Sequence, residues 1–260
     1  MKAYDFRIKV TILGCGSSGG VPTLGYGWGD CDERNVRNRR LRSSIIIDKE
    51  DTSLLVDTSP DLRQQLLNYG SNKVDAVIFT HTHYDHIGGL NELRPLFFKQ
   101  KKRLNIYARE NDMELIKKEF FYLFEKSDHE IYDTYIEPHV IKNKFTIGDI
   151  SGVCLEQNHG FSESIGIRID DFAYSTDVAF MSDETLNNLK GINTWIVDCL
   201  SLKSIKPTHA HLDQVLRWIE KVGPRQTFLT HMGTTMDYDT LLQILPKNIK
   251  PAHDQMVIFI

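Results

Sequence analysis

Four side chains that bind metals or carry protons lie within the stretch "FTHTHYDHIGG" (79–89): His81, His83, Asp85 and His86. Imidazole nitrogens and a carboxylate are the ligands that Zn, Mn and Fe take in proteins. Neighbours one or two residues apart cannot share a helix face, which needs a spacing of three or four. We therefore expect a loop to bring the four groups together. The alternative, a polar loop with coincidental histidines, is disfavoured because unpaired buried imidazoles are costly.

The elements that must position this stretch are readable from apolar patterns. A continuous apolar run at 74–79 precedes it and predicts a strand buried on both faces, and a helix is expected to begin near Gly88. A helix at 61–69, with Ser59 as N-cap and Pro60 at the first helical position, should stop at Gly70. Further helices are expected at 111–126 and 212–222, and further strands at 7–13, 43–48, 53–56, 104–108, 144–147, 153–157, 164–169, 172–175, 194–199 and 227–230. Strands come first in each half and helices follow, which predicts a layered α/β fold.

Composition restricts the class of protein. The chain has 260 residues, 41% of them hydrophobic and 25% charged, which is ordinary for one globular domain spanning 1–260. Its four cysteines are far apart with no CxxC pair, which favours reduced thiols in a cytoplasmic protein. No apolar run suggests a signal segment or a membrane span, so no membrane partner is expected. The net charge of −4 predicts no general affinity for nucleic acid.

The HxHxDH pattern of 81–86 resembles the signature of the metallo-β-lactamase superfamily. The resemblance implies three more ligands in the order His, Asp, His, each at a strand end, and the sequence supplies His159, Asp177 and His231. Taken singly, His159 and His231 are as compatible with a hydrogen-bonded position in the core as with a metal-binding role. Carried over from the family, one metal is held by His81, His83 and His159 and a second by Asp85, His86 and His231, with Asp177 bridging. The early Asp57 of "LLVDTSP" is expected to support the metal loop through hydrogen bonds.

Longer stretches resemble one branch of this superfamily. "TILGCGSSGGVP", "NVRNRRLRSSIII", "LLVDTSPDLRQQL" and "KPTHAHLDQVLRWIEKVGPRQTFLTHMG" are similar to the phosphodiesterases that open phosphoribosyl 1,2-cyclic phosphate, and more distantly to tRNA 3′-processing endonucleases. The resemblance implies a four-layer αββα sandwich, two divalent ions (Zn or Mn) and hydrolysis of a small, cyclic or nucleotide-like phosphodiester. The alternatives are an RNA 3′-processing endonuclease and a thioesterase of the glyoxalase II type. Whether two copies form a homodimer stays open.

Two basic or glycine-rich segments are candidates for phosphate contacts. The GxGxxG of "GCGSSGG" (14–20) follows a strand, but "VPTLGYGWGD" cannot form the helix that a dinucleotide site needs. Either a tight turn or a phosphate-binding loop is compatible with it. The Arg34–Arg42 run is either a solvated basic face or supplies one or two phosphate contacts, and His253 is a candidate for the pocket rim.

The sequence also departs from its relatives in two ways. Only Cys31 follows the "VP" at 21–22, so a cysteine-rich structural zinc site is not expected. The segment 104–145 looks helical and mixed in charge, unlike the flexible arm with which the endonucleases grip tRNA.

One histidine outside the metal set is expected to be catalytic. The related enzymes place a non-ligand histidine 22 residues before the last metal histidine, and counting back from His231 reaches His209. His209 and His211 are two residues apart and should point in different directions. Because the helix at 212–222 begins just after them, His209 is expected in the preceding loop, over the metals, as a general acid. The alternative is that His209 only caps or packs that loop.

Overall fold

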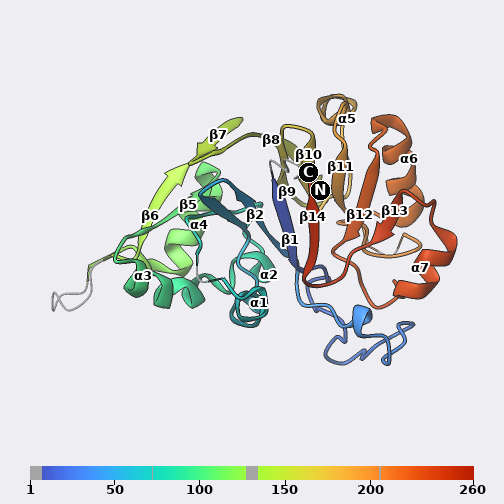
Figure 1. Cartoon of the computed structure of the whole chain (residues 1–260), viewed down its shortest axis with the longest axis horizontal. Coiled ribbons are helices and arrows are strands. Elements are labelled where there is room, and N and C mark those ends of the chain that lie inside the picture. The colour runs from blue at the N-terminus through green and yellow to red at the C-terminus, as the bar shows by residue number, and fades with distance from the viewer. Residues whose placement is uncertain (1–7, 72, 127–133, 205) are drawn as a thin grey trace, which may run out of the picture.

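Two seven-stranded sheets face each other in the computed structural model, which describes residues 8–71, 73–126, 134–204 and 206–260 (Figure 1). The first sheet has the order β14-β1-β2-β3-β4-β5-β6, with β1 Lys9–Gly14, β2 Ser44–Lys49, β3 Thr52–Val56, β4 Ala76–Ile78, β5 Leu104–Ala108, β6 Ile136–Val140 and β14 Met256–Phe259. The second has the order β13-β12-β11-β10-β9-β8-β7, with β7 Lys144–Ile147, β8 Ile150–His159, β9 Ser162–Ile169, β10 Phe172–Ser175, β11 Thr194–Asp198, β12 Gln226–Thr230 and β13 Ile249–Pro251.

Helices cover the outer face of each sheet. The first sheet carries α1 Leu62–Tyr69, α2 Tyr84–Ile87, α3 Arg94–Gln100 and α4 Glu110–Glu119, and the second carries α5 Asp183–Leu189, α6 Leu212–Val222 and α7 Tyr238–Ile244 (Figure 1). Short 3-10 helices lie at η1 Val36–Asn38, η2 Leu90–Leu93 and η3 Phe121–Leu123. The expected αββα layering is therefore confirmed. No helix in the described parts of the chain is both long and apolar enough to cross a bilayer.

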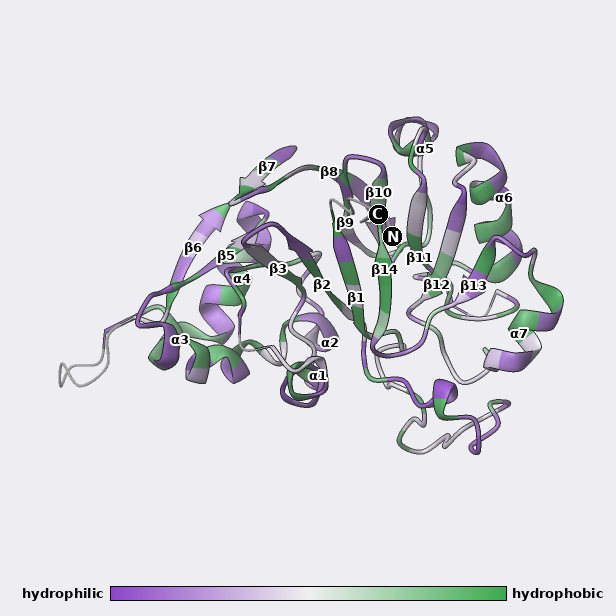
Figure 2. Cartoon of the chain, in the orientation of Figure 1, coloured by the Kyte–Doolittle hydropathy of each residue, from purple (hydrophilic) through white to green (hydrophobic). Residues whose placement is uncertain are grey.

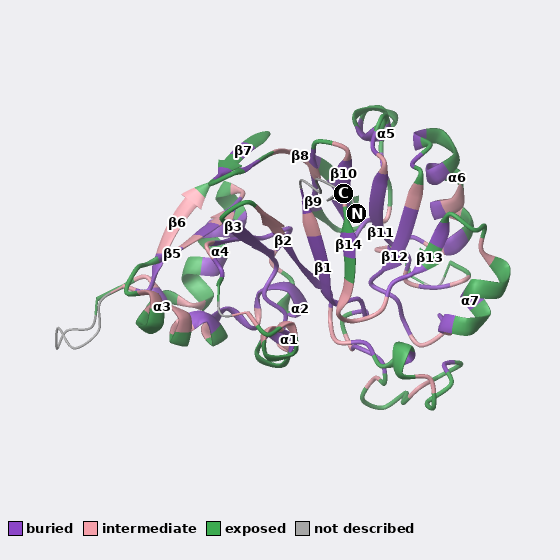
Figure 3. Cartoon of the chain, in the orientation of Figure 1, coloured by how far each residue is buried: buried purple, intermediate pink, exposed green. Residues whose placement is uncertain are grey.

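Alternation along the strands explains why both faces of each sheet are buried. Ile45 and Ile47 of β2 belong to the large core cluster that fills the space between the sheets, whereas Ile46 between them belongs to the cluster under α1–α4. Successive strand side chains point to opposite faces, so an apolar run such as "SIIID" supplies both cores. The central strands are accordingly apolar and buried, and the exposed surface lies mainly on helices and loops (Figures 2 and 3).

Several local expectations differ from the structure. Helix α1 begins at Leu62, one residue later than expected, with Asp61 rather than Ser59 at the N-cap position. The Ser59 hydroxyl still accepts from the Asp61 amide, as an N-cap side chain does, and donates to Gln65. Helix α4 ends at Glu119 rather than at 126, and β6 was not expected, whereas β5 and β7 lie where strands were expected. Tertiary pairing of β6 with β5 overrides the weak local signal there.

Chain direction places the site. Strands β3, β4, β5 and β6 run parallel in the first sheet, and β10, β11, β12 and β13 run parallel in the second. The carboxyl ends of parallel strands lie at one edge of a sheet, so loops leaving these strands gather together. Ligands of open α/β sheets bind at such an edge.

The close packing at Gly14 gives a test of this framework. A Cβ added at Gly14 would overlap the carbonyl oxygen of Arg42, which is backbone and cannot swing aside. We expect Gly14→Ala to lower the free energy of unfolding in urea by about 3 kcal/mol or more, the upper range for overpacking. Gly70→Ala is the control, because Gly70 has φ +76° with open space around it. Only the left-handed backbone conformation is unfavourable for alanine there, which should lower the free energy of unfolding by about 1–2 kcal/mol. Equal effects of the two substitutions would contradict the described packing.

Candidate metal centre

The structure brings all seven expected metal-binding residues to one edge of the sandwich. Each lies in a loop or helix start just beyond a strand, or at a strand's last residue: His81, His83, Asp85 and His86 after β4, His159 at the end of β8, Asp177 after β10 and His231 after β12. Asp57, Asp177 and His231 all have positive φ, at 62°, 51° and 54°. Non-glycine residues rarely adopt this conformation, and where they do it concentrates at functional sites.

The HxHxDH stretch is partly loop and partly helix. His81 lies in the loop after β4, His83 is the N-cap of α2, and Asp85 and His86 are within α2. The expected loop is thus only half of the arrangement, because one turn of helix redirects Asp85 and His86. All of the seven are buried except His83, which is exposed and marks where solvent reaches the site.

Three imidazoles form the first cluster. His83 Nδ1 lies 3.0 Å from His81 Nε2 and 3.2 Å from His159 Nε2. Asp177 Oδ1 lies 3.8 Å from His81 Nε2 and 3.6 Å from His159 Nε2. These four ligand atoms lie within 4.8 Å of one another.

Asp177 also belongs to the second cluster. Its Oδ2 lies 3.0 Å from His86 Nε2, and its Oδ1 lies 3.4 Å from His231 Nε2. Asp85 Oδ2 completes this cluster, 3.3 Å from His86 Nε2 and 3.5 Å from His231 Nε2. Asp177 is therefore the carboxylate that the two clusters share.

The hydrogen bonds behind the first cluster fix which ring nitrogens carry protons. His159 Nδ1 lies 2.6 Å from the Thr208 carbonyl oxygen, which can only accept. The Thr80 hydroxyl donates to Asp57 at 2.8 Å, so it accepts from His81 Nδ1 at 3.1 Å. The Nε2 atoms of His81 and His159 therefore present lone pairs to His83, and a single proton on His83 cannot satisfy both well.

Two ring nitrogens of the histidines in the second cluster make no hydrogen bond. Among the described residues, these are His86 Nε2, although Asp177 Oδ2 lies 3.0 Å away, and His231 Nδ1, which is not the ring nitrogen that faces Asp177. Buried polar atoms in native proteins are almost always hydrogen-bonded, so an exception such as His86 Nε2 calls for an explanation, for example an ion. Burial lowers the pKa of His231, but Asp177 and Asp85 overcome it and raise that pKa to about 9. The carboxylates thus draw positive charge into a buried site, and N/O donors of this kind fit a divalent cation.

Asp57 supports the site as expected. It is fully buried, accepts from the Thr80 amide and hydroxyl at 2.8 Å each, and lies 2.7 Å from His86 Nδ1. Burial raises the pKa of Asp57, and the contacts with His86 and Thr80 oppose that rise. One carboxylate thereby orients His86 directly and His81 through Thr80.

His209 lies over the clusters, and His211 does not. His209 Nε2 is 3.9 Å from Asp177 Oδ1, and its ring stacks on His231 with centroids 4.6 Å apart. His209 Nδ1 lies 2.9 Å from Oδ2 of the buried Asp198, which also accepts from the Val178 amide. His211 is instead the N-cap of α6.

Asp198 was not anticipated from the sequence. Its signal was available, because it ends the apolar strand "TWIVD" as Asp57 follows "LLV".

The two segments suggested for phosphate contacts are engaged in part within the protein. In the 14–20 loop the amides of Gly16, Ser17 and Gly20 donate to Leu41, Met232 and Ser17. The arginines of the Arg34–Arg42 run all have protein contacts: Arg34 with Asp32, Arg37 with Tyr238, Arg39 with Trp28, Arg40 with backbone carbonyls, and Arg42 with Asp61. His253 is half-buried and bonds the Asp254 carbonyl rather than the clusters.

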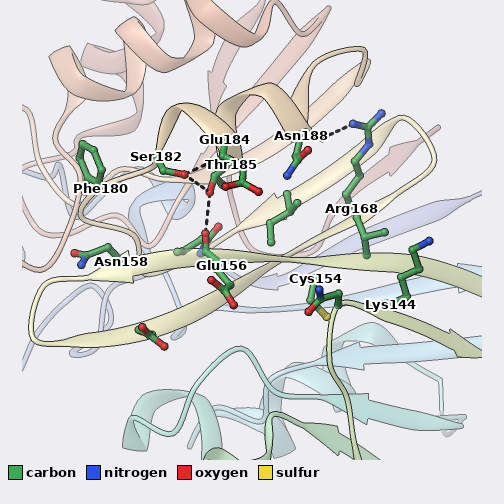
Figure 4. A pocket seen from close by; sticks show the side chains of 15 residues that line it. Lys144, Cys154, Glu156, Asn158, Arg168, Phe180, Ser182, Glu184, Thr185 and Asn188 are labelled. Carbon is green, nitrogen blue, oxygen red and sulfur yellow. Dashed lines mark hydrogen bonds between the residues drawn. The ribbon is translucent and has the colours of Figure 1, made fainter.

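A groove of about 730 Å³ lies elsewhere, between β8 and α5. Cys154, Glu156 and Asn158 line it from β8, and Thr185 lines it from α5 (Figure 4). Asn158 precedes His159 in the strand, so the two side chains point to opposite faces. The groove contains none of the seven candidate ligands and is separate from the clusters.

Comparison with known proteins agrees with this geometry. Residues 52–232 match the model of the Beta-lactamase superfamily domain. The crystal structure of a new diphosphatase from the PhnP family is 32% identical, with a TM-score of 0.89 and 96% of each chain covered. Human tRNase Z, short form, is 16% identical with a TM-score of 0.69, covering 96% of this chain and 98% of that one, which shows a shared fold.

Two curated relatives carry other names. An octanoyltransferase of Porphyromonas gingivalis is 29% identical over 253 residues, covering 95% of this chain and 50% of that protein, so the chain spans half of its length. The anti-Pycsar protein Apyc1 of Paenibacillus harenae is 23% identical over 228 residues, covering 75% of this chain and 84% of that protein.

The position of Asp57 yields a prediction. Asp57→Asn replaces one acceptor oxygen by an NH₂ group, which cannot accept from Thr80 or His86. We expect the affinity for Zn to fall about 10–100-fold, the usual effect of removing a partner behind a metal ligand, with an unchanged far-UV spectrum. Zn titration by calorimetry measures this, with the exposed Asp51→Asn as control. Wild-type affinity in Asp57→Asn would show that the carboxylate does not support the site.

Proposed function

This chain belongs to the metallo-β-lactamase superfamily and to its PhnP family, and from that premise we propose that it is a phosphodiesterase with two divalent metals. The protein is a metal-dependent hydrolase. Its proposed substrate is a small phosphodiester, cyclic or nucleotide-like. One domain spanning 1–260 is proposed to carry the whole site. The observation that supports this most directly is Asp177, whose carboxylate belongs to both clusters: its Oδ1 lies 3.6 Å from His159 Nε2 and 3.4 Å from His231 Nε2, and its Oδ2 lies 3.0 Å from His86 Nε2.

The proposed ligand sets follow these clusters. His81, His83 and His159 would hold one metal, Asp85, His86 and His231 would hold the other, and Asp177, which belongs to both groups, would be shared. Nitrogen and carboxylate donors suit Zn or Mn. When bound, such a pair of ions lowers the pKa of a water and neutralises the charge of a phosphodiester.

Residues of the chain supply the proton transfers. Asp85 presents one oxygen to His86 and His231, which leaves its other oxygen to accept a proton from the attacking water. His209 is the proposed acid: its Nδ1 is held by Asp198, and its Nε2 faces the clusters. Nε2 would donate a proton to the departing alkoxide, which is the role of a positioned general acid. Asp198, being buried and bonded to Val178 as well, fixes the ring in that orientation.

A substrate panel tests the reaction class. It contains bis-p-nitrophenyl phosphate, a 2′,3′-cyclic nucleotide, p-nitrophenyl phosphate, a cephalosporin and a tRNA precursor. A diphosphate and an octanoyl thioester are added because two similar proteins are named a diphosphatase and an octanoyltransferase. We expect the small diesters to have the highest kcat/KM. Faster turnover of the thioester or of the tRNA precursor would replace this proposal by one of the two alternatives.

A substitution at Asp85 tests the two proposed metal sites separately. Asp85→Asn leaves the three histidines of the first cluster unchanged and weakens only the second, so we expect one tightly held Zn per chain instead of two. Diesterase turnover should fall about 10²-fold or more, as for loss of a positioned base. Elemental analysis after Zn loading and gel filtration gives the stoichiometry, with wild type as control. Two retained ions would show that Asp85 does not hold the second metal, and full activity would show that it does not accept the proton.

The acid role of His209 has its own test. His209→Ala should keep both metals and lose about 10²–10⁴-fold in kcat on a substrate with a poor leaving group. His211→Ala, two residues along, is the matched control and should lose far less. A p-nitrophenolate leaving group needs no proton and should partly restore turnover in His209→Ala. Absence of that rescue, or a more severe defect in His211→Ala, would refute the assignment.

A further inference from the structure

Arg40 is a buried arginine that the proposed chemistry does not use. Its side chain is 1% exposed, whereas arginine is almost never fully buried without partners. It lies before β2 and behind the glycine-rich loop. Its backbone exchanges hydrogen bonds with Val21 at 2.8 and 2.9 Å, and a Cβ added at Gly16 would lie 3.0 Å from Arg40 Cβ.

The guanidinium reaches the turn that follows His231. Nη2 donates to the Met236 carbonyl at 2.6 Å and to Asn38 Oδ1 at 3.1 Å, and Nη1 donates to the Gly233 carbonyl at 3.5 Å. Gly233 and Met236 lie two and five residues after His231. One planar group therefore fastens two points of this turn to the segment that leads into β2.

Other backbone contacts hold the same turn. The Met232 amide donates to the Cys15 carbonyl at 2.9 Å, and the Ser17 amide donates to the Met232 carbonyl at 3.1 Å. The Gly233 amide donates to the Leu200 carbonyl at 2.9 Å. His231 itself has φ +54°. Such a conformation persists only where the surroundings over-determine it, and the residues just after His231 supply that constraint.

We propose that Arg40 is a positioning residue for His231: it holds the turn 231–236 against the segment that leads into β2 so that His231 Nε2 faces Asp85 and Asp177. This rests on the proposed assignment of His231 to the second metal. The competing account is that Arg40 stabilises the whole fold and has no specific effect at the site. The two accounts differ in what happens to the second metal in a folded variant.

Metal titration separates them. Metal-free wild type, Arg40→Met and Arg40→Lys are titrated with Zn by calorimetry, and His231→Ala identifies the binding event that depends on His231. We expect Arg40→Met to weaken that event about 10–100-fold and to leave the other within a few-fold. Arg40→Lys keeps the positive charge but not the planar guanidinium with its several donors, so its Zn affinity should lie between those of Arg40→Met and wild type. Arg39→Lys, at an exposed neighbour stacked on Trp28, is the control and should bind as wild type.

Hydrogen exchange adds a readout that needs no metal. Peptides covering 231–236 should exchange faster in the Arg40 variants, while peptides from β3 and β4 should not. If the Arg40 variants do not fold, Asn38→Ala removes one acceptor of the guanidinium, together with the bonds of Asn38 to Asp32, Asp237 and Tyr238, and leaves Arg40 in place. It should weaken the same binding event several-fold.

Two results would overturn the proposal. One is a folded Arg40 variant with a lower Tm but wild-type affinity for both metals. The other is unchanged affinity in Asn38→Ala when the Arg40 variants fail to fold. Failure of the proposed function looks different, because wild type would then bind two metals and hydrolyse no diester.

Discussion

Lone pairs of several imidazoles and carboxylates meet at one buried edge of this protein, where positive charge is stabilised, as the raised pKa of His231, about 9, indicates. His83 Nδ1 lies 3.0 Å from His81 Nε2 and 3.2 Å from His159 Nε2, while the Nδ1 protons of His81 and His159 are already donated elsewhere. Without a cation, this arrangement would be repulsive and costly to bury. With one, the same groups become ligands, so the arrangement is understandable only as a site built for positive charge.

The arrangement of strands in the two sheets brings these side chains together. Parallel strands in both sheets end at the same edge, and apolar packing between the sheets fixes the distance between those ends. Close packing transmits position well because protein interiors are dense. The left-handed backbone at Asp57, Asp177 and His231 then turns each side chain inward immediately after its strand. The strain of these residues is tolerated because hydrogen-bonded neighbours hold them, as Thr80 does for Asp57.

Sequence reasoning succeeded where the signal was local and repeated. The HxHxDH spacing, together with the order His, Asp, His at strand ends that the family resemblance implies, selected the seven residues that the structure gathers. It failed where partners are distant in sequence. The bond between His209 and Asp198 joins a loop to a strand end, and the contacts of Arg40 join residues almost two hundred positions apart. Strand β6 was missed for the same reason, because its pairing with β5 rather than its own pattern makes it a strand.

The central claim is that two cations lie on either side of Asp177. Diffraction from crystals of Zn-loaded protein, collected at the zinc absorption edge, tests it most directly. The account predicts two anomalous peaks about 3.5–4 Å apart. One should lie among His81, His83 and His159, the other among Asp85, His86 and His231, with Asp177 contacting both. A single peak at saturating Zn, or a second peak away from Asp85, His86 and His231, would contradict it.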